Sequence, residues 1–339
     1  MTDDHPVVDR LARPIHDLRI SITDRCNFRC VYCMPKEKFG RDHKFLAKRE
    51  LLSFEEIERV ARIFGELGVR KLRITGGEPL LRADVVDLVG RLVEVPGIDD
   101  VSMTTNASLV SSERARALRD AGLRRVNVSL DSLDDDDFVR INDVGCSVRR
   151  VLDGIDALQE AGFDPIKVNM VVRRGLNEQS ILPMARHFHG TPVILRFIEY
   201  MDVGSTNGWR LSEVYSAREI HDTINAEMPL ESLQPNYLGE VARRWRYCDG
   251  GGEIGIISSV TQPFCRHCSR ARLSAVGKLY TCLFAPDGFD LRAYLRSGCD
   301  DRAFKAHIAG IWRRREDRYS ELRSQVNLPR KVEMSHIGG

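Results

Sequence analysis

The sequence has no long apolar run and no excess of charge of either sign. Nowhere do about 18 apolar residues follow one another, which excludes a membrane-spanning helix. Its 339 residues carry 51 Lys and Arg against 49 Asp and Glu. The net charge therefore gives no reason to expect nucleic acid or a membrane surface as a bulk partner. Any anion-binding site must be local.

A secretory signal is also missing, because residues 1–10 are acidic and polar and contain no apolar core. We therefore expect a reducing cytoplasm, where neighbouring thiols bind metal more often than they pair as disulfides. In that setting nine cysteines is a high count. Six of them fall into two tight groups. The other three are isolated and are interpreted as small buried hydrophobic residues: Cys146, Cys248 and Cys299.

The first cysteine group is Cys26, Cys30 and Cys33, spaced C-x3-C-x2-C. Thiolates are soft ligands, and this spacing indicates a metal or cluster site. A cubane iron–sulfur cluster usually has four cysteine ligands, so three leave one iron open for an exogenous ligand. Residues 18–23 alternate like a strand, which places the loop beyond a first strand, where barrel enzymes keep their chemistry. At this point zinc remains the alternative.

The second cysteine group is Cys265, Cys268 and Cys282, spaced C-x2-C-x13-C, and it also lacks a fourth cysteine. His267 lies inside it and offers a possible fourth ligand for a tetrahedral zinc site. The adjacent cysteine restricts the reach of that histidine. We therefore favour a second cubane cluster with an open iron, and zinc is the weaker alternative.

Basic residues recur on predicted strands and beside the second cysteine group. A cation inside a barrel must be paired or must meet an anionic ligand, and guanidinium groups suit phosphate. Two arginines one residue apart on an extended segment point to the same face. Thr104, at a strand end, adds a hydroxyl. The set predicts a polyphosphate ligand, and its basic members are Arg19, Arg73, Lys167, Arg270 and Arg272.

Between residues 53 and 200, short strands alternate with helices, which argues for a parallel sheet. Ser53 and Glu56 form a capping box that starts the first of these helices. About six strand–helix units fall short of the eight that close a full barrel. We predict an α/β fold, an open, partial TIM-type barrel. Its strands cover residues 18–23, 71–75, 101–105, 125–130, 166–172 and 191–199, and its helices residues 54–67, 83–95, 111–121, 148–161 and 178–188.

Beyond Tyr200 the alternation stops, and Gly, Asn and Pro become frequent. Short strands are expected over residues 241–247, 254–257 and 273–280, and helices over 291–296 and 300–315. The predicted organisation is an N-terminal arm (1–17), the partial barrel (18–200), a C-terminal α+β region with the second cluster (201–319) and an extended tail (320–339).

Gly76-Gly77-Glu78-Pro79 follows the second predicted strand. Its glycines let a ligand approach the backbone, and its carboxylate offers an acceptor to an ammonium group. With the first cysteine group, this motif resembles the radical S-adenosylmethionine (SAM) superfamily. The resemblance implies that SAM chelates the open iron and is split into methionine and a 5′-deoxyadenosyl radical. It also implies SAM contacts at Tyr32, Gly77, Ser129 and Met201.

Longer segments resemble one family in that superfamily, the GTP 3′,8-cyclases of molybdenum cofactor biosynthesis. They are residues 22–30, 73–80, 196–202, 264–265 and 268–273, and the final Gly338-Gly339. One departure is Ala107, where the family usually has glycine, and we expect it to alter a turn but no ligand. The competing interpretations are a peptide-maturing radical SAM enzyme, whose C-terminal region usually holds more cysteines, and a zinc-binding or electron-transfer scaffold.

The resemblance implies two 4Fe-4S clusters, one on each cysteine group. The deoxyadenosyl radical would abstract hydrogen from C3′ of GTP, and attack on C8 would give (8S)-3′,8-cyclo-7,8-dihydroguanosine 5′-triphosphate. The second cluster would help hold the guanine, and Gly338 and Gly339 would enter and complete the active site. An electron donor and a downstream pyranopterin-forming protein are implied partners, in a monomer or homodimer. GTP would be held by Arg19, Arg73, Thr104, Lys167, Arg270 and Arg272.

Overall fold

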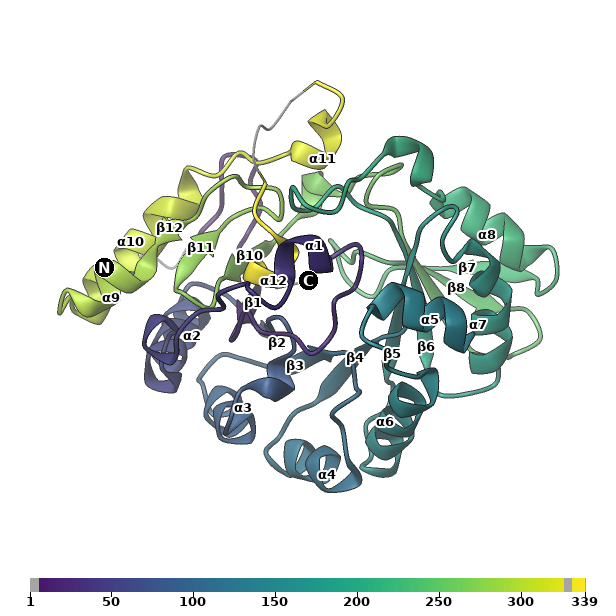
Figure 1. Cartoon of the computed structure of the whole chain (residues 1–339). Coiled ribbons are helices and arrows are strands. Elements are labelled where there is room, and N and C mark those ends of the chain that lie inside the picture. Colours follow the sequence, from purple (N-terminus) through teal and green to yellow (C-terminus); the bar gives the residue numbers. More distant parts are fainter. Residues whose placement is uncertain (1–5, 326–330, 339) are drawn as a thin grey trace.

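The computed structural model describes residues 6–325 and 331–338. Within them, twelve strands form one sheet in the order β12-β11-β10-β1-β2-β3-β4-β5-β6-β9-β8-β7. Figure 1 shows the sheet as a curved wall with most of the helices on its convex side. The two edge strands do not pair with each other, so the predicted open, partial barrel is confirmed.

The six central strands are parallel and follow one another in chain order. They are β1 (Asp17–Ser21), β2 (Lys71–Thr75), β3 (Asp100–Thr105), β4 (Arg125–Ser129), β5 (Lys167–Val172) and β6 (Ile194–Glu199). The helices between them are α1 (Lys36–Phe39), α2 (Phe54–Glu66), α3 (Val85–Val93), α4 (Ser112–Asp120), α5 (Asp135–Asn142), α6 (Val148–Glu160) and α7 (Ile181–Phe188). Each predicted strand is confirmed to within a few residues.

Each central strand has one apolar face and one polar face. Leu18 and Ile20 of β1 are fully buried in the core, as is Ile74 of β2. Arg19, which lies between the two β1 residues, and Arg73, which precedes Ile74, are only half-buried. Because side chains alternate along a strand, the apolar set packs against the surrounding helices. The basic set is left to face the inside of the curve.

The sheet extends on both sides with strands from the second half of the chain. β9 (Glu253–Ile257) pairs parallel with β6, and β10 (Arg270–Leu273) pairs parallel with β1. The parallel part of the sheet therefore has eight strands rather than six. Antiparallel strands complete the edges: β7 (Leu230–Leu233), β8 (Arg243–Tyr247), β11 (Lys278–Tyr280) and β12 (Phe289–Asp290). The division of the chain at residue 200 stays a prediction, since the sheet is continuous across it.

Two predictions for the second half are wrong. The single strand expected over residues 273–280 is two strands, β10 and β11, because a turn at Gly277 (φ 78°) reverses the chain. The tail expected to be extended contains helical turns, which are too short to show a helical period in the sequence. The remaining helices are α8 (Ala217–Asn225), α9 (Leu291–Arg296), α10 (Asp301–Arg313), α11 (Tyr319–Leu322) and α12 (Met334–Ile337). Nowhere in the described ranges is a helix both long and apolar enough to cross a membrane.

Candidate functional site

The first cysteine loop begins where β1 ends and is tied to the glycine loop that follows β2. The Gly77 amide donates to the Thr23 carbonyl (2.8 Å) and the Glu78 amide donates to the Arg25 carbonyl (2.8 Å). Residue 77 has to be glycine, because a Cβ there would lie 2.1 Å from the Arg25 carbonyl oxygen. The two motifs recognised in the sequence are thus one interlocked structure at the carboxyl ends of neighbouring strands.

The thiols of Cys26, Cys30 and Cys33 are free and half-buried. Burial raises the pKa of Cys26 to about 11 and that of Cys33 to about 12. Burial also raises the pKa of Cys30, with the nearby Asp131 carboxylate adding to the effect. Thiols so reluctant to ionise alone become thiolates when the positive charge of a metal replaces the proton.

Glu78 links β2 to β3 rather than standing free. Its carboxylate accepts hydrogen bonds from the Leu80 amide (3.0 Å), the Thr105 hydroxyl (2.8 Å) and the Asn106 amide (2.8 Å). Burial raises its pKa to about 7, opposed by these hydrogen bonds. The sequence offered this carboxylate to an ammonium group. In the structure it has three partners within the protein and also lines the cavity described below, so its contact with an ammonium group stays a prediction.

The other residues predicted to contact SAM lie along the same edge of the sheet. The Tyr32 hydroxyl donates to the Asp131 carboxylate (2.6 Å), which also accepts from the Val171 amide (2.9 Å). Burial raises the pKa of Tyr32, and it raises that of Asp131 to about 6. Ser129 is the last residue of β4, and Met201 lies just beyond β6. Asp131 belongs to this group and was not predicted from the sequence.

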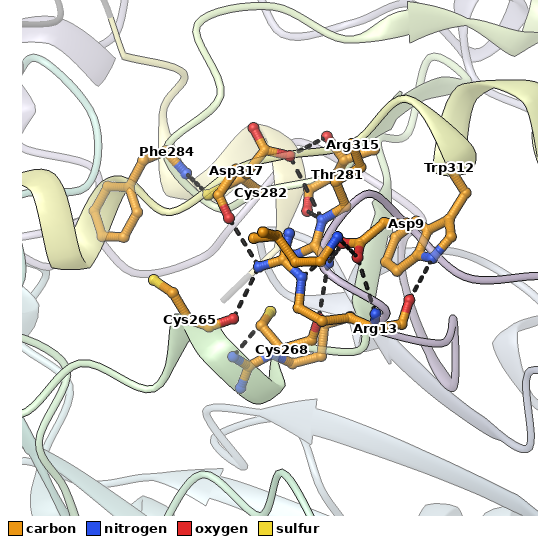
Figure 2. A network of polar contacts seen from close by, with 12 residues as sticks. Asp9, Arg13, Cys265, Cys268, Thr281, Cys282, Phe284, Trp312, Arg315 and Asp317 are labelled. Atoms are coloured by element: carbon orange, nitrogen blue, oxygen red, sulfur yellow. Dashed lines mark hydrogen bonds and ion pairs between the residues drawn. The ribbon is translucent and has the colours of Figure 1, made fainter.

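The second cysteine group comes from the segments around β10 and β11. Cys265 opens a short 3₁₀ helix, Cys268 follows it, and Cys282 lies just after β11. The Phe284 amide donates to Cys282 Sγ (3.5 Å), as Figure 2 shows. Burial raises the pKa of Cys268, but the Arg270 and Arg315 guanidiniums outweigh it and lower that pKa to about 6.

Both cysteine groups fit a cluster better than a single ion. In the part of the chain that the structure describes, no three His, Cys, Asp or Glu side chains are placed to ligate one metal ion. A zinc site needs its ligands to converge on one ion, at about 2.3 Å for sulfur, so this arrangement does not favour zinc with His267. A cubane cluster binds each thiolate through a different iron, and its cysteines need only surround a common space.

That space is a cavity of about 340 Å³ on the inside of the curved sheet. All six cysteines of the two groups line it. The predicted ligand contacts also line it, which brings together residues from across the sequence: Arg19, Tyr32, Arg73, Gly77, Thr104, Ser129, Lys167, Met201, Arg270 and Arg272.

Four arginines lie at one level across this face of the sheet. Arg272 is the cross-strand neighbour of Arg19, and Arg19 is that of Arg73. Ser102 neighbours Arg73 and, on its other side, Arg125. Burial and the neighbouring guanidiniums lower the pKa of Arg19 and Arg73, and they lower that of Arg272 to about 9. Arg125 is paired with Asp100, but three neighbouring cations as poorly compensated as Arg19, Arg73 and Arg272 favour an anionic ligand.

Two further observations fit such a ligand. Among the described residues, neither Arg73 Nε nor the Thr104 hydroxyl has a hydrogen-bond partner, although both atoms are buried. Buried polar groups in folded proteins nearly always have partners. Burial and the nearby Arg196 lower the pKa of Lys167 to about 8. Each of these groups would gain a hydrogen bond or an ion pair from a phosphate oxygen placed beside it.

Arg125 and Arg196 line the same cavity and were missed by the sequence reasoning. Arg125 Nε donates to the Asp100 carboxylate (3.1 Å). Arg196 donates to the side-chain oxygens of Asn127 (2.6 Å) and Asn169 (3.0 Å). A signal was available, because both are basic residues that alternate with apolar residues on predicted strands.

The C-terminal tail reaches the rim of the cavity, and Figure 1 shows α12 inside the curve of the sheet. Met334 lines the cavity, and the Gly338 carbonyl accepts a hydrogen bond from Arg272. Gly338 has φ 72°, and a Cβ there would lie 2.1 Å from Thr75 Cγ2, so only glycine fits. Gly338 itself does not line the cavity, and Gly339 lies outside the described residues.

Asp202 anchors this tail to the loop after β6. Its buried carboxylate accepts hydrogen bonds from the Tyr319 hydroxyl (2.7 Å), Arg323 Nε (2.9 Å) and Lys331 Nζ (2.6 Å). Glu333 accepts two more hydrogen bonds from the same loop. The strand end that carries Met201 therefore also holds the tail.

Two family models match the chain. One is described as the Radical SAM superfamily and matches residues 20–188, and the other as Molybdenum Cofactor Synthesis C and matches residues 193–321. A GTP 3′,8-cyclase of Acidothermus cellulolyticus is 52% identical over 360 residues, with 98% of this chain and 99% of the relative covered. One of Staphylococcus carnosus is 47% identical over 338 residues, with the same coverage.

Solved structures share the fold at low identity. Streptococcus suis SuiB bound to S-adenosylmethionine matches with a TM-score of 0.60 at 17% identity, over 92% of this chain and 68% of SuiB. SuiB bound to the precursor peptide SuiA matches with a TM-score of 0.63 at 15% identity, over 94% of this chain and 69% of SuiB. At such identities the likeness shows the fold alone.

Proposed function

This chain belongs to the GTP 3′,8-cyclase family of radical SAM enzymes, and we propose that its cavity holds SAM at the first cysteine group and GTP at the second. Its function is the first step of molybdenum cofactor biosynthesis. One observation carries the assignment of ligands to places: two three-cysteine groups and a row of poorly compensated cations line the same cavity.

Cys26, Cys30 and Cys33 hold one 4Fe-4S cluster, and Cys265, Cys268 and Cys282 hold the other. When bound, the first cluster supplies the electron that splits SAM into methionine and a 5′-deoxyadenosyl radical, which takes hydrogen from C3′ of GTP. The chain contributes three thiols at each place and leaves one iron free for a ligand. Support comes from the free state of all six thiols and from their common cavity.

The residues at the carboxyl ends of the strands position SAM. Gly77 has no side chain and lets the ligand approach the backbone of its loop. Tyr32 is oriented by its hydrogen bond to Asp131, and Ser129 and Met201 complete the same wall. Together they fix the reactive carbon of SAM relative to GTP.

The basic residues deeper in the cavity bind the triphosphate of GTP. Arginine presents a planar fork of donors that matches phosphate oxygens, and the buried Arg73 Nε and Thr104 hydroxyl each gain a partner. We include Arg125 and Arg196 among the basic residues that surround the nucleotide. The predicted contacts are Arg19, Arg73, Thr104, Lys167, Arg270 and Arg272.

Gly338 and Gly339 complete the site. The hydrogen bond from Arg272 to the Gly338 carbonyl joins the tail to a residue of the nucleotide site. A tail that reaches this point limits the access of water and of competing hydrogen donors to a radical intermediate, which is the protein's part in cofactor chemistry.

Two partners follow from the chemistry: a reductant for the first cluster and a protein that converts the cyclised nucleotide to a pyranopterin. Neither nucleic acid nor a membrane has a part in this reaction. We assign the protein to a reducing cytoplasm, because cluster assembly needs free thiols, and we leave it as a monomer or a homodimer.

The test is an anaerobic reaction of the iron-reconstituted protein with SAM, dithionite and GTP, with ATP in a matched reaction. We expect 5′-deoxyadenosine and a cyclised nucleotide to form together with GTP, and no cyclised product with ATP. Formation of 5′-deoxyadenosine without consumption of GTP would leave a radical SAM enzyme that acts on another substrate, such as a peptide.

A further inference from the structure

A buried ion cluster lies behind the second cysteine group and joins the N-terminal arm to the end of α10. The Asp9 carboxylate contacts Arg13 Nε at 2.6 Å and Arg315 Nη1 at 3.0 Å. All three side chains are at most 2% exposed. Figure 2 shows the three side chains packed together beside the cysteines. Charges are buried only where they are well paired or serve a purpose, so this cluster calls for an explanation.

The two arginines hold the backbone of all three cysteine segments. Arg13 Nη1 donates to the Cys265 carbonyl (2.8 Å) and Arg315 Nη1 donates to the Cys268 carbonyl (2.8 Å). Arg315 Nε donates to the carbonyl of Thr281 (2.9 Å), the residue before Cys282. Each cysteine is therefore fixed through its own or the preceding carbonyl.

The arm is rigid enough to act as part of this clamp. Asp9 accepts hydrogen bonds from the Leu11 and Arg13 amides (2.9 Å each), and the Arg13 carbonyl accepts one from Trp312 Nε1 (3.0 Å). The Arg315 guanidinium lies over the Trp312 ring, 4.5 Å from its centroid. The arm is thus a closed turn docked on α10.

We propose that Asp9, Arg13 and Arg315 form an arm clamp, a positioning device that preassembles the second cysteine group for its iron–sulfur cluster. The inference rests on the proposed second cluster. Residues behind the ligands of a metal site orient those ligands, and mutating them typically costs about 10- to 100-fold in metal affinity. The N-terminal arm then has a role in a site at the other end of the sequence.

The clamp carries charges of both signs, since the Arg13 and Arg315 guanidiniums meet the Asp9 carboxylate and Arg315 Nε also lies 3.5 Å from the Asp317 carboxylate. Arg13 Nη2 is buried and has no hydrogen-bond partner among the described residues, so the clamp retains an uncommitted donor near the cysteines. Positive charge beside an iron–sulfur cluster stabilises the reduced state and raises its reduction potential. Removal of the Arg315 guanidinium would leave Asp9 and Asp317 with one cation fewer, and it is therefore expected to lower the potential of the second cluster.

The test uses the full chain with Cys26, Cys30 and Cys33 replaced by Ala, so that iron reports on the second group alone. In this background we compare Asp9→Asn, Arg315→Gln and Arg315→Lys. The matched control is Arg10→Gln. Arg10 lies on the same arm, its side chain makes an exposed ion pair with Glu316 (58% and 69% exposed), and the substitution keeps the backbone hydrogen bond from the Arg10 amide to the Arg315 carbonyl. The measurements are iron per chain, the rate of iron release to a chelator and the midpoint potential.

We expect Asp9→Asn and Arg315→Gln to release iron at least about tenfold faster than the parent, as the usual cost of a lost supporting residue implies. Arg10→Gln should match the parent. Arg315→Lys keeps the charge but loses the fork that holds two carbonyls, so it should release iron faster at a nearly unchanged midpoint potential. Arg315→Gln should lower the potential.

Three outcomes decide the matter. If the parent with only the second cysteine group holds no iron, the proposed cluster fails, whatever the clamp does. If the parent holds iron and the clamp variants release it at the parent rate, the arm clamp is wrong. The same variants made with the second cysteine group replaced by Ala should retain the first cluster and SAM cleavage, and equal loss from both clusters would show a general folding defect and overturn the proposal.

Discussion

The two cysteine groups share a ligand count but differ in their electrostatic surroundings. Carboxylates stand near the first group, where Asp131 adds to the raised pKa of Cys30 and Glu78 to that of Cys26. Guanidiniums stand near the second, where Arg270 and Arg315 lower the pKa of Cys268, although burial and the Asp317 carboxylate raise that of Cys282 to about 12. SAM carries a sulfonium and an ammonium, whereas GTP carries a triphosphate. The surroundings therefore distinguish two motifs that cysteine spacing alone leaves alike.

Removing the cysteines tests the comparison most severely. Replacing the first group (Cys26, Cys30 and Cys33) by Ala should abolish 5′-deoxyadenosine formation and leave about four irons per chain. Replacing the second group (Cys265, Cys268 and Cys282) should preserve SAM cleavage and stop formation of the cyclised nucleotide. Iron analysis and chromatography of the products measure both results. Cys248→Ala, at an exposed and isolated cysteine, is the control, and loss of both activities in both variants would contradict the division of labour.

Gly338→Ala tests the tail. Gly338 packs against Thr75, at the end of β2 near the first cysteine group, and its carbonyl accepts a hydrogen bond from Arg272, near the second. At φ 72° and ψ 136°, Gly338 lies in a sparsely populated region of backbone conformation, where a residue with a Cβ costs about 1–3 kcal/mol, and the clash with Thr75 adds to this. We expect formation of the cyclised nucleotide to fall by at least about tenfold, with iron content and GTP affinity nearly intact. Gly310→Ala is the matched control, since a Cβ there meets nothing closer than 3.5 Å. Cyclisation at the parent rate in Gly338→Ala would rule out a role for the tail.

Removing a basic side chain from the cavity should weaken the binding of GTP but not that of SAM. Charge-assisted hydrogen bonds contribute about 1.5–3 kcal/mol each, so Arg19→Ala, Arg73→Ala and Lys167→Ala should each weaken GTP binding by about 10- to 150-fold. SAM affinity, measured by anaerobic equilibrium binding, should change little. Arg124→Ala removes an exposed arginine just before β4 and serves as the control. Equal losses of affinity for both ligands would indicate a folding defect and would contradict separate places for SAM and GTP.

The pH dependence of GTP binding sharpens the same contrast. Because burial lowers the pKa of Lys167 to about 8, the free protein keeps this charge below pH 8 and loses it above. A bound triphosphate favours the charged form, so GTP affinity should fall as the pH rises from about 8 to 10, by up to about tenfold per unit. In Lys167→Gln the fall between pH 8 and 9 should be smaller, and the fall that remains at higher pH is assigned to Arg272, whose pKa burial and Arg270 lower to about 9. Parallel profiles for the parent and the variant, from equilibrium binding across pH, would contradict it.

The smallest expected effect concerns Ala107. It follows the carboxyl end of β3, the edge of the sheet where the first cysteine group lies, and has φ 57°. An alanine in this conformation costs about 1–2 kcal/mol, partly offset by the entropy that glycine loses on folding. Ala107→Gly should therefore raise the free energy of unfolding in urea by up to about 1 kcal/mol. SAM cleavage should not change, since the residue touches no proposed ligand site. A drop in cleavage would give this turn a direct role.

The sequence predicted local structure well and long-range pairing poorly. Strands β1 to β6 are short runs bounded by turns, and each was visible in its own stretch of sequence. The pairings of β9 with β6 and of β10 with β1 join strands far apart in the chain. Although α8 lies between β6 and β9, β7 and β8 also intervene, so the regular strand–helix alternation does not lead on to β9. Without those pairings, the closeness of the two cysteine groups could be expected only from the family resemblance.

The candidate site shows the same limit. Cysteines and glycines with tight spacing were found because their chemistry needs neighbours in sequence. Asp131 and Asp202 were not, since each gains its role from partners on distant segments, such as Tyr32 or Lys331. Arg125 and Arg196 could have been found by extending the alternation argument to every strand.

The anchoring of the tail at Asp202 has a consequence for effective concentration. Gly338 lies seven residues beyond Lys331, whose ammonium group is held by Asp202. A short tether of this kind presents its tip at roughly millimolar local concentration. On the proposal that the tail completes the site, the tail can leave Arg272 and return to it with only weak contacts of its own, such as the hydrogen bond to the Gly338 carbonyl. The proposed exchange of nucleotide and protection of the radical would then be compatible, because the local concentration set by Asp202 favours a fast return of the tail.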